Sequence, residues 1–238
     1  MSGVLEVVVL TTLAGITIPL GGFLAKIEHI HPQWLEDEFR HSVIAFGGGV
    51  LLAAVALVLV PEGITEQPPW IASLAILTGG ICFMFCDIFL ATHRSSAAQL
   101  LAMLLDFVPE SMALGASFAT DGQSVGLLLA ILIGLQNLPE GFNAYRELAS
   151  SSTMRKSVIL PGFCLLVILG PVSGLTGYFV LALFPRLVGL IMLFAAGGIL
   201  YLTFQDIAPQ AQIEQRWAPS LGAVIGFVFG LVAQMIIA

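Results

Sequence analysis

Two segments of the sequence place a glutamate directly after a proline inside otherwise apolar stretches. Residues 104–115 read LLDFVPESMALG, and residues 134–145 read GLQNLPEGFNAY. On a helix, residues three or four apart share one face, so each glutamate has a carboxylate or amide neighbour one turn earlier. Oxygens of these types are the ligands that hard divalent cations prefer. We therefore predict a metal site formed by Asp106, Glu110, Gln136, Asn137 and Glu140.

The two prolines themselves point to the same place in the chain. Pro109 and Pro139 have no N–H to donate, and each ring displaces the carbonyl group four residues earlier. Broken helices are tolerated within a membrane where the freed groups are buried in protein or line a wet cavity. Two such breaks at matching positions are typical of binding sites in transporters. We expect both helices to break here, so that freed carbonyls could join the ligands.

A purely structural interpretation is two proline kinks with protonated glutamates that hydrogen-bond to neighbouring helices. At a rise of about 1.5 Å per residue, Asp106 would lie roughly 14 Å from the helix end. A charged carboxylate at that depth costs about 2.5–3.5 kcal/mol. Neither segment offers a Lys or Arg at that depth, so protons or a bound cation must neutralise the acids. The repetition of the motif favours the cation.

The remainder of the sequence is typical of a membrane protein. Of its 238 residues, 58% are hydrophobic and 10% are charged, against about 25% charged in a soluble domain. Apolar runs of about twenty residues recur along the whole chain. They predict an all-α polytopic fold, one domain over residues 1–238, with eight transmembrane helices in the lipid bilayer. The predicted spans are 3–25, 41–61, 70–92, 97–119, 123–148, 157–183, 186–206 and 218–238.

The basic residues predict an orientation. If the N-terminus lies outside, seven of the eight Lys and Arg residues fall in cytoplasmic connections and only Arg186 lies opposite. The positive-inside rule then places both termini on the extracytoplasmic side of an inner (plasma) membrane. Eight scattered basic residues are also too few for a phosphate-binding surface, so we expect no nucleic-acid partner.

An internal similarity relates the second and seventh spans. Residues 45–61 read AFGGGVLLAAVALVLVP, and residues 193–209 read LFAAGGILYLTFQDIAP. Phe, Gly, Leu and Pro coincide at a constant offset of 148, although the two spans run in opposite directions. Related sequences of opposite orientation are typical of inverted-repeat transporters. Spans 1–3 and 6–8 are therefore a possible inverted repeat around spans 4 and 5.

Polar residues near the ends of other spans are weaker candidates. Acids at the outer end could gather cations at an entrance, and polar residues at the cytoplasmic face could serve an exit. A His-x-His segment in the first cytoplasmic connection could bind metal weakly. For each group, ordinary solvation is the competing interpretation. The entrance candidates are Glu62 and Glu66, the exit candidates are Asp87, Gln205 and Asp206, and the weak cytoplasmic candidates are His29 and His31.

These segments resemble the Zrt/Irt-like (ZIP) family of divalent metal transporters over essentially the whole chain. The most specific match is QNLPEG at residues 136–141, which is similar to the motif on the family's fifth span. The resemblance implies eight spans, a mid-membrane site on spans 4 and 5 for one or two ions, and uptake toward the cytoplasm. It also implies an elevator-like motion of one helix group against another, and a homodimer.

The chain departs from the family pattern within the site. Asp106 and Phe107 stand where the family's fourth span usually has His-Asn, and Gly170–Pro171 stands where the sixth span often has Glu-Pro. We therefore predict a single, all-oxygen ion position. Such ligands suit manganese or iron, and zinc also accepts carboxylates. The metal ion would be the substrate rather than a resident cofactor.

Other functions are compatible with parts of the pattern. A proton-coupled carrier of a small solute would use the acids as a relay, but it would need a roomier pocket with an aromatic or basic group. A ZIP relative that binds metal without moving it is a further alternative. An intramembrane aspartyl protease would need facing aspartates, and Asp106 and Asp206 lie at different expected depths without a Gly-x-Gly-Asp context. We expect no enzyme.

Overall fold

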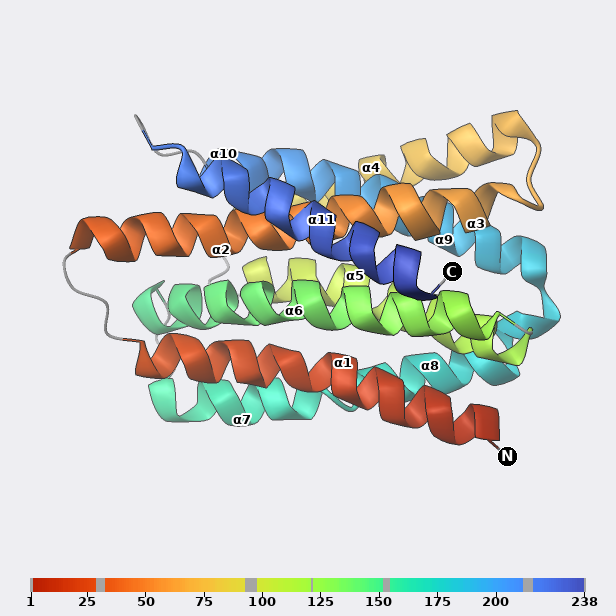
Figure 1. Cartoon of the computed structure of the whole chain (residues 1–238), viewed down its shortest axis with the longest axis horizontal. Helices are drawn as coiled ribbons and strands as arrows, with labels where there is room; N and C mark the ends of the chain where they lie inside the picture. Colours follow the sequence, from red (N-terminus) through yellow and green to blue (C-terminus); the bar gives the residue numbers. More distant parts are fainter. Residues whose placement is uncertain are drawn as a thin grey trace.

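The computed structural model describes residues 2–28, 33–92, 98–120, 122–151, 155–211 and 216–237. Within these ranges the secondary structure is helical, and the helices form one elongated bundle (Figure 1). The longer elements are α1 (Ser2–Ile27), α2 (Gln33–Ala54), α4 (Pro69–Thr92), α5 (Ala98–Ala119), α6 (Gln123–Ser151), α7 (Lys156–Leu166), α8 (Leu169–Phe179), α9 (Pro185–Leu202) and α11 (Ala218–Ile237). The short elements are the π-helices η1 (Val55–Leu59) and η3 (Thr203–Ile207), the 3-10 helix η2 (Leu181–Leu183), α3 (Val60–Ile64) and α10 (Ala208–Gln210).

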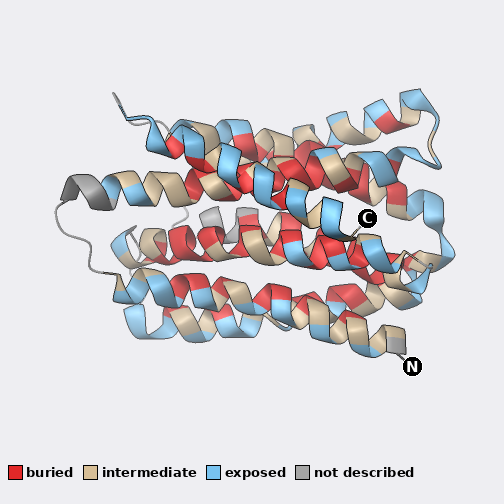
Figure 2. Cartoon of the chain, in the orientation of Figure 1, coloured by how far each residue is buried: buried red, intermediate tan, exposed pale blue. Residues whose placement is uncertain are grey.

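The expected all-α polytopic membrane fold is confirmed. Among the described residues, seven helical segments are long and apolar enough to cross a membrane. They correspond to seven of the eight predicted spans. The remaining span is α5, a helix of 22 residues that packs against α6 and α8 inside the same bundle. The chain therefore buries apolar side chains where helices meet and exposes others on the outside of the bundle (Figure 2).

The helices pack as two sets. In one set, α1 packs along α6 and α5 packs along α8; in the other, α2 packs along α11 and α4 along α9. Figure 1 shows the first set below and the second above. Contacts of α2 with α6 and of α5 with α9 join the two sets. Both helices that carry the Pro-Glu motif thus belong to the first set and face the second.

The prediction that Pro109 and Pro139 break their helices is wrong. Both prolines lie inside uninterrupted helices, α5 and α6. One missing hydrogen bond does not break a helix whose flanking turns are held by packing on their neighbours, although proline still cannot pair with the carbonyl four residues earlier. That carbonyl belongs to Leu105 in α5, and Leu105 lines a cavity described below.

The irregular backbone lies elsewhere. The sixth span divides into α7 and α8 just before Pro171. The second and seventh spans each contain a π-helical turn, η1 before Pro61 and η3 before Pro209. The two π-turns begin 148 residues apart, which is the offset of the internal sequence similarity. Such turns occur often at functional sites.

Candidate metal site

The five predicted ligands are buried together in the middle of α5 and α6. Asp106 is 2% exposed, Glu140 is 7% exposed, and the other three are fully buried. The i, i+4 spacing on each helix accounts for this arrangement, because it turns both acids of α5 toward α6 and both polar groups of α6 back toward α5. The side chain of Gln136 spans the gap by donating from Nε2 to Oε2 of Glu110 at 2.7 Å.

Both amide side chains use their nitrogen and leave their oxygen free of hydrogen bonds. Asn137 donates from Nδ2 to the backbone oxygen of Ala14 on α1, at 3.1 Å, and Gln136 donates to Glu110. Four oxygens of the five residues are buried and have no hydrogen-bond partner. These unpaired acceptors are Oε1 of Glu110, Oε1 of Gln136, Oδ1 of Asn137 and Oε2 of Glu140.

A cation is the simplest partner for these oxygens. Leaving one buried acceptor unpaired costs about 1–3 kcal/mol, and such groups are rare in native proteins. Here four acceptors come from two adjacent helices, and two of them belong to carboxylates. A divalent ion would satisfy the lone pairs and the charge together.

The acids alone do not complete a site. Asp106 interacts electrostatically with Glu140 and Glu110, and its Oδ1 accepts a hydrogen bond from the backbone N–H of Phe107 at 2.8 Å. Within the described residues, however, no three His, Cys, Asp or Glu side chains form a group able to hold a metal ion. A metal ion bound here would need other donors as well, and the amide oxygens of Gln136 and Asn137 are the donors that the two helices offer.

Phe107 packs away from these oxygens. Its ring lies where a Cβ added at Gly15 of α1 or at Gly170 of α8 would meet it, and the residue is fully buried. The phenyl ring thus joins α5 to α1 and α8 as a packing group. It supplies no ligand, in agreement with its chemistry.

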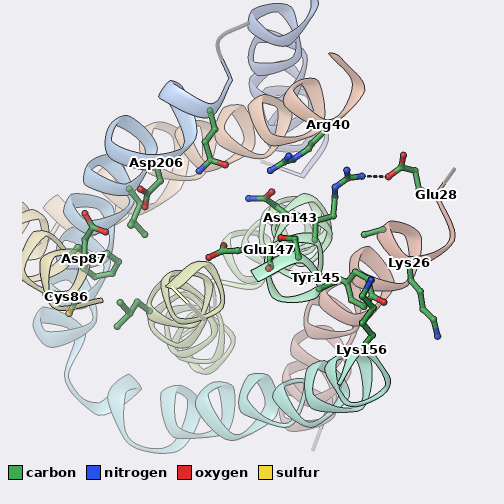
Figure 3. A pocket seen from close by; sticks show the side chains of 18 residues that line it. Lys26, Glu28, Arg40, Cys86, Asp87, Asn143, Tyr145, Glu147, Lys156 and Asp206 are labelled. Carbon is green, nitrogen blue, oxygen red and sulfur yellow. Dashed lines mark hydrogen bonds and ion pairs between the residues drawn. The ribbon is translucent and has the colours of Figure 1, made fainter. Parts of the chain in front are cut away.

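A cavity of about 840 Å³ is lined in part by Asn143 and Glu147, which follow Glu140 on α6 (Figure 3). Acids and bases both line it, among them Asp87, Glu147, Asp206, Lys26, Arg40 and Lys156. Tyr201 donates a hydrogen bond from its hydroxyl to Oδ2 of Asp87 at 2.9 Å. Two of the predicted exit residues, Asp87 and Asp206, therefore lie together in this cavity. The third, Gln205, is exposed and is not among the residues that line it.

Asn143 and Glu147 are cavity residues that the sequence interpretation did not include in the site. Both lie on α6, and Glu147 lies within electrostatic reach of Asp206 and Arg40. The sequence contains a signal for both residues, namely their helical spacing. Polar residues follow one another at spacings of four, three and four along this segment: Gln136, Glu140, Asn143 and Glu147. That spacing keeps residues on one helix face. A continuous polar stripe therefore runs along α6 from the buried oxygens to the cavity.

The other candidates are not brought to the site. Glu62 and Glu66 are exposed, and Glu66 lines a shallow groove with Arg186 and neighbouring residues of α9, apart from α5 and α6. Their role as an entrance stays a prediction. His29 and His31 lie outside the described residues.

Comparison with known proteins supports the resemblance to the ZIP family. No family model matches the chain. The chain is 34% identical over 145 residues to a protein named zinc transporter GufA from Myxococcus xanthus. The match covers 60% of this chain and 56% of that relative, so it spans little more than half of the relative's length. The relative is a ZIP-family member, which confirms the expected resemblance to a divergent ZIP-like protein.

Proposed function

We propose that this chain is a ZIP-like transporter that moves divalent metal ions across the membrane toward the cytoplasm. The ion would bind between α5 and α6, at Asp106, Glu110, Gln136, Asn137 and Glu140. One observation carries the proposal: two adjacent helices hold four buried oxygens without hydrogen-bond partners, two on carboxylates and two on amides whose nitrogens donate hydrogen bonds.

The route after binding leads from Glu140 to the large cavity. Asn143 and Glu147 lie further along the same face of α6 and line this cavity with Asp87 and Asp206. The carboxylates that line this cavity would attract a cation leaving the site. The direction toward the cytoplasm rests on the basic residues around the cavity, which the positive-inside rule assigns to that side.

The identity of the ion follows from the donors. The relative's name specifies zinc for that protein, and zinc accepts carboxylate oxygens. A set made only of carboxylates and amides is harder than a site containing histidine, so manganese or iron would compete well. We therefore propose zinc, iron and manganese as the substrate class.

We further propose that spans 1–3 and 6–8 are an inverted repeat around spans 4 and 5. The matched glycines Gly49 and Gly197 make equivalent contacts, since an added Cβ would overlap the carbonyl of Ala223 on α11 in one case and of Ile76 on α4 in the other. The pairing of α2 with α11 is thereby the counterpart of the pairing of α9 with α4. The two π-turns at the same offset add support.

The proposal is tested by metal flux into liposomes that contain an ion-sensitive dye. Wild-type protein should pass Mn²⁺, Fe²⁺ or Zn²⁺, whereas Glu110→Gln and Glu140→Gln should each lose most of the flux. These substitutions keep the shape of the side chain and remove one ligand charge. Asp37→Asn is the matched control, because Asp37 is an exposed acid on α2 outside the site.

Two outcomes would contradict the proposal. Flux in wild type that both glutamine variants retain would place the pathway elsewhere. Absence of flux for any ion, together with metal binding that depends on Glu110 and Glu140, would leave a metal-binding relative that does not transport.

A further inference from the structure

A small void separates the proposed metal site from the large cavity. It measures about 20 Å³ and is lined by Asp106 and Glu140 of the proposed site and by Asp206, which also lines the large cavity. Aliphatic side chains complete the wall, including Met103, Ile199 and Leu202. A space of this size holds about one water molecule. A divalent ion that keeps its shell of six waters therefore does not fit in this void.

Two residues line both the void and the large cavity. Leu202 and Asp206 belong to the wall of the 20 Å³ space and also to the wall of the 840 Å³ cavity. Of these, Leu202 is the apolar one, and it is 8% exposed. Its side chain therefore forms part of the partition between the buried oxygens and the space that opens toward the basic end of the bundle. Met103 and Ile199, at 1% and 0% exposed, support the partition from α5 and α9.

We propose that Leu202 closes the ion's route from the metal site through this void to the cavity, an inference that rests on the proposed function of the site. An aliphatic side chain has no lone pair to replace a water ligand of the ion. A hydrated ion would have to shed waters there without any ligand to replace them. The path therefore stays closed until Leu202 moves away from α5.

The backbone around Leu202 suits such a movement. Leu202 is the last residue of α9, directly before the π-turn η3, which carries Asp206. A π-turn interrupts the regular hydrogen-bond register of a helix and is common at functional sites. A small rotation at this junction would move Leu202 and Asp206 together. The apolar group would leave the path as the carboxylate turns toward Glu140.

The test measures access to the site rather than transport. Cys82, Cys86 and Cys164 are replaced by alanine, and Glu140→Cys supplies one reporter thiol at the site. The detergent-solubilised full-length protein is then treated with a charged methanethiosulfonate reagent. Adding Leu202→Ala should speed modification about tenfold, the factor given by a barrier lower by about 1.4 kcal/mol. Adding Leu200→Ala is the matched control, since Leu200 lies on α9 two residues away and lines neither space.

Equal modification rates in the parent, the Leu202→Ala protein and the Leu200→Ala protein would overturn the proposal. So would equal acceleration by both alanine variants, because that result means general loosening of α9. If Leu202→Ala fails to give a monodisperse protein, Leu202→Val carries the same comparison with a smaller acceleration. The readout is the rate of thiol modification and needs no metal flux. Absence of flux in the wild-type protein would therefore contradict the proposed function without changing the accessibility result.

Discussion

At the scale of single residues, the most informative position is Asp106. It is 2% exposed, lies within electrostatic reach of both glutamates and stands where the resemblance leads one to expect histidine. A carboxylate oxygen at this place makes the donor set uniformly hard. An imidazole nitrogen would favour zinc relative to manganese.

We therefore expect Asp106→His to change ion preference. The ratio of Zn²⁺ to Mn²⁺ affinity should rise about tenfold, which corresponds to about 1.4 kcal/mol. Competition between the two ions, measured by isothermal titration calorimetry in detergent, would give this ratio directly. Asp106→Asn is the control, since it removes the charge without adding nitrogen ligation. An unchanged ratio in the histidine variant would mean that Asp106 is not a ligand.

The residues of the candidate site differ in how far the sequence predicts them. The acids and amides of α5 and α6 are predictable, because polar side chains at helical spacing in an apolar segment require a partner. Glu147 follows the same periodicity but lies near the helix end, where solvation explains an acid equally well. Leu202 carries no sequence signal, since one leucine among many in α9 becomes a partition only through what lies on either side of it.

At the scale of elements, the glycines that bring helices together are more decisive than the prolines. Pro109 and Pro139 lie inside helices that continue without a break. The presence of proline alone predicts a break, because the packing that keeps both helices continuous cannot be read from the sequence. The two π-turns are not predicted from the sequence either, although each lies before the proline that ends one of the two similar segments, 45–61 and 193–209. Close approach at Gly49 and Gly197, by contrast, leaves no room for a methyl group.

We expect Gly49→Ala and Gly197→Ala to destabilise the protein by similar amounts. In each case the added methyl would force α2 from α11, or α9 from α4, at a cost of about 1–3 kcal/mol. Thermal unfolding midpoints in detergent would report the loss. Gly162→Ala is the matched control, because nothing lies within 4 Å of a Cβ added there, and alanine favours a helix over glycine by about 1 kcal/mol. A large difference between the first two variants would contradict their equivalence in an inverted repeat.

At the scale of the whole molecule, the distribution of basic residues distinguishes the two ends of the bundle. Four basic residues line the large cavity, namely Lys26, Arg40, Arg146 and Lys156. Arg186 lies at the other end, where its backbone oxygen accepts a hydrogen bond from Gln67. The charge asymmetry counted in the sequence is thus gathered in space around one opening, which strengthens the expectation that this opening faces the cytoplasm.

Orientation can be read from two exposed positions, one at each end. Thr65 follows α3 at the end near Arg186, and Ser150 lies in the last turn of α6 beside the cavity; both are exposed. In a background without the native cysteines, we expect Thr65→Cys to react with a membrane-impermeant maleimide on intact cells. Ser150→Cys should react only after the cells are permeabilised. The reverse result would mean that the chain has the opposite orientation in the membrane. The acids of the large cavity would then meet the ion on its way into the site rather than on its way out.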